Sequence, residues 1–164
     1  MMKRLFCLAL GLFLIAFESA FFSFLPIEFA KPDLAVPFIV YAVFFLGPVE
    51  GLIASVLFGF SQELLSAAPP GSMVFTKVAV FLGSSFLRHH LYIESRYTFS
   101  LLSTGFVIFE SIVFLALGVI AKGELRNIFN VSLYTLPTAV FTGMLSLPIY
   151  SLLQHLKIPH LETT

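Results

Sequence analysis

Charged side chains in very apolar surroundings are the residues of this sequence that could do chemistry. Glu63 lies in the run "LGPVEGLIASVLFGFSQELLSAAPPGS" (Leu46–Ser72), and Lys77 follows in the next apolar segment. A carboxylate at the centre of a membrane helix costs about 2.5–3.5 kcal/mol on insertion scales, and less toward an interface. We expect Glu63 and Lys77 to form an ion pair that closes the third and fourth apolar segments, because pairing would offset the desolvation of both groups.

Solvation at a membrane surface is the alternative to this ion pair. Pro69 and Pro70 follow Glu63 closely, so the carboxylate can lie near the end of its helix. The ammonium of Lys77 can reach the surface along its own stem. Other glutamates in or beside apolar segments are Glu18, Glu50 and Glu110. Glu50 follows a Gly-Pro pair, where an acid suits the positive end of a helix dipole.

Catalytic motifs do not accompany these charges. The sequence contains no H-E-x-x-H, G-x-S-x-G or S-x-x-K pattern. His89 and His90 are adjacent, so on a helix they point about 100° apart and would not easily share a metal ion. A serine–lysine dyad with Lys77 is not expected, because Ser72 lies five residues before the lysine and Ser84, seven residues after it, is about two helical turns away. We therefore expect no enzyme activity, no cofactor and no metal site.

The composition predicts that membrane helices position these charges. The chain has 164 residues, of which 59% are hydrophobic and 11% charged, whereas soluble domains average about 45–50% and about 25%. Apolar runs repeated from end to end leave too little polar surface to cover a soluble globule. The net charge is zero and no basic patch is present, so binding to nucleic acid is not expected. The single cysteine, Cys7, excludes an intrachain disulfide.

We expect residues 1–164 to form one polytopic domain, an all-α integral membrane bundle of about six transmembrane helices. The second apolar segment is shorter than the about 20 residues that a span needs, so it either crosses or forms a re-entrant hairpin with the third. The predicted spans are about 5–25, 32–46, 48–66, 73–87, 97–121 and 131–153. The positive-inside rule places both termini in the cytoplasm, because that side then carries more basic residues: Lys3, Arg4, Arg88, Arg96 and Lys157.

Small residues recur along the third segment. Gly51, Ser55 and Gly59 follow one another at intervals of four residues, with Glu63 one step further. Each such step advances about 40° around a helix, so the small residues form a slowly winding stripe. Small side chains in this register let another helix approach closely. The stripe predicts either packing inside the bundle, which is the commoner role of such glycines, or a face that binds a partner's helix.

These segments resemble the rod-shape-determining membrane protein family MreD. One part of the resemblance is "KPDL" (Lys31–Leu34), in which Pro32 and Asp33 open a short second helix. The other is a small-residue third helix that ends in an acid with a glycine eight positions later, here Glu63 and Gly71. The family usually has aspartate in place of this glutamate.

The specific similarity covers about residues 31–90, whereas size and helix layout are similar over the whole chain. A second departure is Ser55, where the family has glycine. The resemblance implies a non-enzymatic scaffold of the cell-elongation machinery in the bacterial inner membrane. It further implies binding to an MreC-like single-pass coiled-coil protein, and through it an association with an MreB-like actin homologue and the peptidoglycan synthases.

A transporter subunit is the rival interpretation. The family is similar in helix layout to the substrate-binding subunits of energy-coupling-factor vitamin transporters, which need a cavity with polar contacts. The sequence offers side chains for such a cavity: Glu63, Ser72, Thr76 and Lys77. Stripes of small residues also mark the surfaces through which these subunits meet their coupling protein. The residues alone do not separate the two functions, and the motif favours the scaffold.

Overall fold

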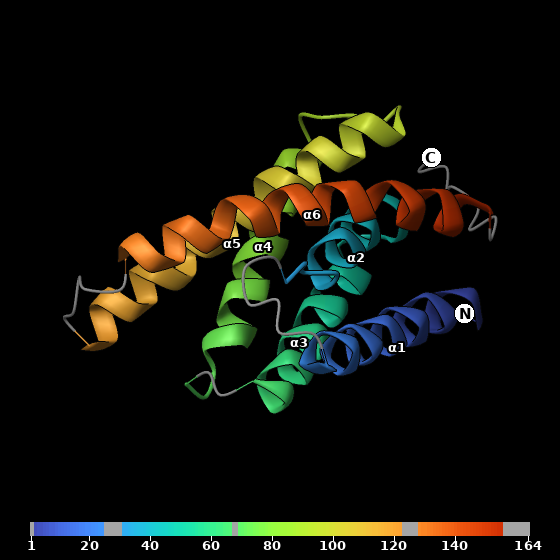
Figure 1. Cartoon of the computed structure of the whole chain (residues 1–164). Helices are drawn as coiled ribbons and strands as arrows, with labels where there is room; N and C mark the ends of the chain where they lie inside the picture. Colours follow the sequence, from blue (N-terminus) through green and yellow to red (C-terminus); the bar gives the residue numbers. More distant parts are fainter. Residues whose placement is uncertain (1, 25–30, 67–68, 123–127, 156–164) are drawn as a thin grey trace.

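The computed structural model describes residues 2–24, 31–66, 69–122 and 128–155, and the regular secondary structure within them is helical (Figure 1). η1 is a π-helical turn that continues α2 directly. The elements are α1 (Met2–Phe24), α2 (Ala35–Tyr41), η1 (Ala42–Leu46), α3 (Pro48–Leu65), α4 (Ser72–Arg88), α5 (Arg96–Lys122) and α6 (Ile128–His155). The all-α prediction is confirmed, and the helices follow the predicted apolar segments closely.

Two stretches within the described helices, Arg96–Ile120 and Thr135–His155, are long and apolar enough to cross a membrane. The apolar stretches Ala9–Ala20 and Ala35–Leu46 are shorter. α2 and η1 contribute seven and five residues, and a helix rises about 1.5 Å per residue, so together they cannot span a hydrocarbon core of about 30 Å. The structure thus contains fewer helices of spanning length than the sequence predicts.

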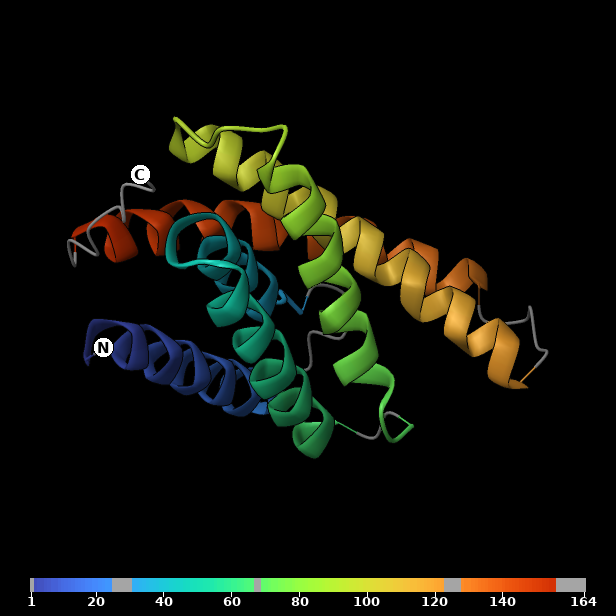
Figure 2. The same cartoon turned by 180° about the vertical axis from the view of Figure 1, so that it is seen from behind.

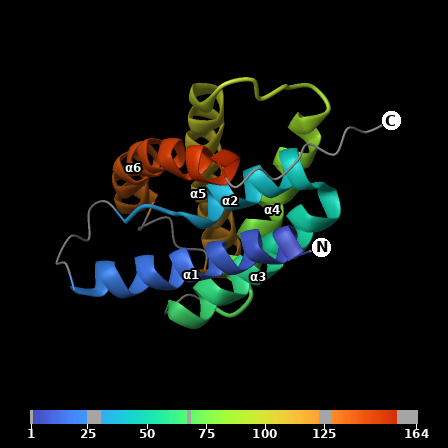
Figure 3. The ribbon, with the colours of Figure 1, turned by 90° about the vertical axis from the view of Figure 1, so that its right-hand side faces the viewer.

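Two helical hairpins and a central short helix organise the bundle. α3 pairs with α4 and α5 pairs with α6, while α1 lies against α3 (Figures 1 and 2). α2 lies between them, and every one of its side chains is buried. Figure 3 shows this central position from the side of the N-terminus. The beginning of α1 and the end of α6 lie on the same side of the molecule (Figures 1 and 2).

The stripe of small residues on α3 is buried within this chain. A Cβ added at Gly59 would lie 2.7 Å from the Cα of Val74 in α4. Gly51 packs equally closely against Val43 of η1, and Ser55 has no exposed surface. The prediction of packing inside the bundle is confirmed. The alternative, a face free to bind a partner's helix, is wrong, because η1 and α4 already cover these positions.

The close approach of α3 and α4 predicts a large effect of a single methyl group. Gly59→Ala should lower the melting temperature of the protein, since the added Cβ meets backbone rather than a movable side chain. Gly105→Ala in α5 is the matched control, because nothing lies within 4 Å of that position, and alanine favours a helix by about 0.8–1 kcal/mol over glycine. Melting temperatures in a mild detergent would measure both. Equal effects of the two substitutions would contradict the close approach.

Candidate functional site

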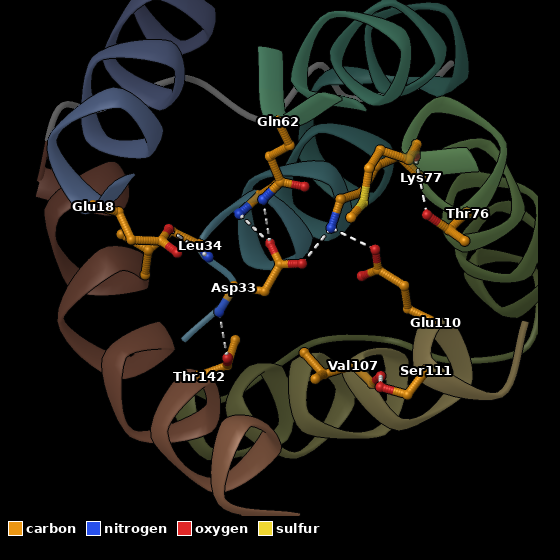
Figure 4. Close-up of polar contacts among 12 residues, drawn as sticks. Glu18, Asp33, Leu34, Gln62, Thr76, Lys77, Val107, Glu110, Ser111 and Thr142 are labelled. Carbon is orange, nitrogen blue, oxygen red and sulfur yellow. Dashed lines mark hydrogen bonds and ion pairs between the residues drawn. The ribbon is translucent and has the colours of Figure 1, made fainter. Parts of the chain in front are cut away.

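A buried ammonium group lies at the centre of the bundle. Lys77 has no exposed surface. Its Nζ lies 2.6 Å from Oε1 of Glu110 on α5 and also contacts Oδ2 of Asp33 (Figure 4). α4 presents the lysine inward because its buried residues recur at helical spacing. These residues are Thr76, Lys77, Val80 and Ser84.

Asp33 joins this ammonium to three further elements. Its Oδ1 accepts hydrogen bonds of 3.0 Å from the backbone N–H of Ala35 and from Nε2 of Gln62 on α3. The first bond satisfies an amide at the open start of α2, which is the usual role of an aspartate just before a helix. The backbone N–H of Asp33 donates to Oγ1 of Thr142 on α6 at 2.9 Å. The aspartate therefore accepts from the first amide of one helix and ties three others to it.

Carboxylates outnumber the ammonium in this cluster. Glu18 of α1 is 5% exposed, and its Oε2 accepts a 3.2 Å hydrogen bond from the backbone N–H of Leu34. Asp33 and Glu110 contact Lys77, and Glu18 lies on the other side of Asp33, so the cluster contains three acidic side chains and one ammonium (Figure 4). Oε2 of Glu110 is buried and has no hydrogen-bond partner. The cluster is thus held together by Lys77 but is not neutralised by it.

A cavity of about 250 Å³ lies beside the cluster. The three acidic side chains line it, and so do the exposed Lys31 and the buried Pro32. The rest of the lining is divided between the apolar Ile15, Leu65, Met73, Val107 and Phe114 and the polar Ser19, Gln62, Ser66, Ser111 and Thr138. A cavity that combines apolar contacts with convergent polar groups is the usual form of a small-molecule site.

The predicted ion pair between Glu63 and Lys77 is wrong. Lys77 is directed toward Asp33 and Glu110, whereas Oε1 of Glu63 accepts a 2.7 Å hydrogen bond from the backbone N–H of Gly71. Gly71 has φ +85°, a left-handed conformation that favours glycine. Glu63 and Gly71, the two motif residues that lie eight positions apart, therefore close the turn between α3 and α4. The cavity described above is not lined by Glu63, Ser72, Thr76 or Lys77, which the sequence had suggested for such a site.

Sequence reasoning identified some members of the cluster and missed others. Asp33 entered the predicted site through the family resemblance, and Glu18 and Glu110 were noted as charges in apolar segments without a role. Gln62 and Thr142 were not considered. A usable signal was present, because a buried lysine requires carboxylates, and these segments contained more acids than Glu63 alone. In the described part of the chain, no group of three or more His, Cys, Asp or Glu residues is arranged to hold a metal ion.

Comparison of the chain with protein-family models, curated proteins and solved structures found no match. The interpretation of the site therefore depends on its own geometry.

The observed pairing predicts a specific pattern of energetic coupling. Lys77→Met should lower the free energy of unfolding by about 3–5 kcal/mol, because it leaves buried carboxylates without their cation. The effects of Lys77→Met and Glu110→Gln on the free energy of unfolding should be non-additive by about 0.5–3 kcal/mol. The effects of Lys77→Met and Glu63→Gln should be additive. Denaturant titration in mixed micelles would measure both cycles. Coupling to Glu63 rather than to Glu110 would contradict the observed pairing.

Proposed function

We propose that this chain is a non-enzymatic scaffold of the bacterial cell-elongation machinery, a multi-pass protein of the inner membrane with both termini in the cytoplasm. In this role it binds an MreC-like single-pass protein. Through that protein it associates with an MreB-like actin homologue and the cell-wall synthases, and so supports lateral peptidoglycan synthesis and rod shape.

One observation carries this proposal. The residues that resemble the MreD family are the ones that hold the helices of this chain together. Asp33 connects the start of α2 to α3, α4 and α6. Glu63 and Gly71 close the turn between α3 and α4. A loose sequence motif is more persuasive when its members make defined contacts than when they are scattered over the surface.

Exposed apolar side chains support the membrane part of the proposal. The outer face of α3 is apolar over its whole length. Its exposed residues include Val49, Leu52, Ile53, Val56, Leu57, Phe60 and Leu64. Their spacing places them on one side of the helix, and soluble monomers rarely expose apolar patches of such extent. In a bilayer the same side chains contact lipid or the helix of a partner.

The buried cluster supports the scaffold role. A scaffold has to present its outer faces at fixed angles to its partners. Here α1 is attached through Glu18 and α4 through Lys77 to the same short segment, and α5 is attached to Lys77 through Glu110. Since an unpaired charge is costly in an apolar bundle, these attachments strongly favour a single arrangement of the helices.

Affinity purification from native membranes tests the proposal. The tagged protein, extracted in a mild detergent, should recover an MreC-like coiled-coil protein identified by mass spectrometry. Lys77→Met should recover several-fold less of it at equal protein amount, because the helix arrangement is lost, whereas Gly105→Ala should recover as much as the wild type. Loss of the protein from its own cells should convert rods to rounded cells. A purification that yields no coiled-coil partner and a depletion that leaves rods intact would refute the scaffold.

A transporter role is the second candidate, and the cavity of about 250 Å³ favours it. In this case the chain is the substrate-binding subunit of an energy-coupling-factor type transporter. The same purification discriminates between the two functions, because this subunit would recover paired ATPases and a coupling membrane protein instead.

A further inference from the structure

We propose that the cavity beside Glu18 and Glu110 binds a primary ammonium group, carried either by a small free amine or by the headgroup of an aminophospholipid. The proposal is independent of the scaffold function, because it concerns a ligand site that the recovery of a protein partner does not test. Its basis is the combination of a cavity, an excess of buried carboxylates on its wall, and one carboxylate oxygen without a partner.

The buried oxygen points to a ligand. Glu110 is 8% exposed, and its Oε1 is held by Lys77, whereas its Oε2 is buried without a hydrogen bond. A buried acceptor that has lost water and gained no donor is costly, more so when it is charged. Because Glu110 lines the cavity, a ligand there can supply the missing donor.

The charge of the wall selects a cation. Glu18, Asp33 and Glu110 line the cavity, and Lys77, which binds the latter two, does not. The lysine on the lining is Lys31, which is exposed to solvent. An anion would therefore meet three acidic side chains. A cation would complete the neutralisation that Lys77 begins.

The size and the donors of the ligand follow from the same wall. An ammonium group has three N–H donors, so it can donate to Oε2 of Glu110 and to a second acceptor on the wall. The carboxylates and thiols of the described chain form no group suited to a metal ion. A volume of about 250 Å³ lies below the about 300–1,000 Å³ of drug-sized sites, so the ligand is small. Ile15, Leu65 and Phe114 offer apolar contact to its hydrocarbon part.

The first experiment measures binding of 2-phenylethylamine to the purified full-length protein in a mild detergent at neutral pH, by titration calorimetry. 2-Phenylethanol has a similar shape without the charge. The amine should bind saturably and about tenfold or more tightly than the alcohol, since charge-assisted hydrogen bonds are the stronger ones. Glu18→Gln and Glu110→Gln should each weaken binding of the amine by about tenfold. Glu94→Gln, at an exposed loop position, should leave this binding unchanged.

Glu110→Gln disturbs the pairing of Lys77, so further variants separate binding from folding. Glu18→Gln leaves the ion pairs of Lys77 in place, because they are made by Asp33 and Glu110. Ser111→Leu fills the cavity without removing a charge. Glu18→Gln should weaken binding of the amine by about tenfold, and Ser111→Leu should abolish it while recovery of the protein partner stays unchanged. Binding that persists in the folded Ser111→Leu protein would overturn the assignment of the site.

A second experiment distinguishes the source of the ammonium. The protein is placed in nanodiscs of phosphatidylglycerol with or without phosphatidylethanolamine, and melting temperatures are compared. Stabilisation by phosphatidylethanolamine that is lost in Ser111→Leu identifies a lipid headgroup as the ligand. Binding of the free amine without this stabilisation identifies a soluble amine. If neither the amine nor the lipid distinguishes the wild type from Ser111→Leu, the proposal is refuted.

Discussion

The buried ammonium of Lys77 is the interaction on which the rest of this structure depends. A lysine without exposed surface is tolerated only where carboxylates surround it, and here they come from the segment before α2 and from α5. That requirement brings Asp33 to the middle of the bundle, and Asp33 then determines where α2 begins. The same residue holds Gln62 and Thr142, so the positions of α3 and α6 follow from the position of one charge.

The short central helix and the small residues of α3 make this arrangement possible. α2 is buried throughout, which requires its neighbours to approach it from several directions. Gly51 and Gly59 allow that approach, because α3 meets η1 and α4 at distances that a Cβ would not permit. The polar cluster and the close packing are therefore complementary. Close packing excludes water from the charges, and the charges favour one arrangement of helices whose apolar surfaces would otherwise pack in many ways.

The excess of carboxylates gives the centre a second property beyond stability. A core that served structure alone would be most stable if every charge were balanced and every acceptor bonded. Glu110 keeps a buried oxygen without a partner, and it does so on the wall of a cavity. The proposed scaffold function and the proposed ammonium site are compatible, because outer helix faces would serve partners while Glu18 and Glu110 are buried. A bound headgroup or amine would add to the same network of contacts that orients the outer faces.

The sequence by itself determined the helices and their apolar character, because local periodicity and the content of apolar residues are properties of neighbouring positions. The bounds of α3 and α4, the turn at Gly71 and the buried stripe of small residues were all predictable in this way. The tertiary structure alone decided which charges meet. The sequence paired Lys77 with Glu63, whereas the packing of the helices places Asp33 and Glu110 against the lysine and turns Glu63 toward Gly71. Contacts between segments far apart in the chain depend on the path of the backbone between them, which residue types and spacing do not specify.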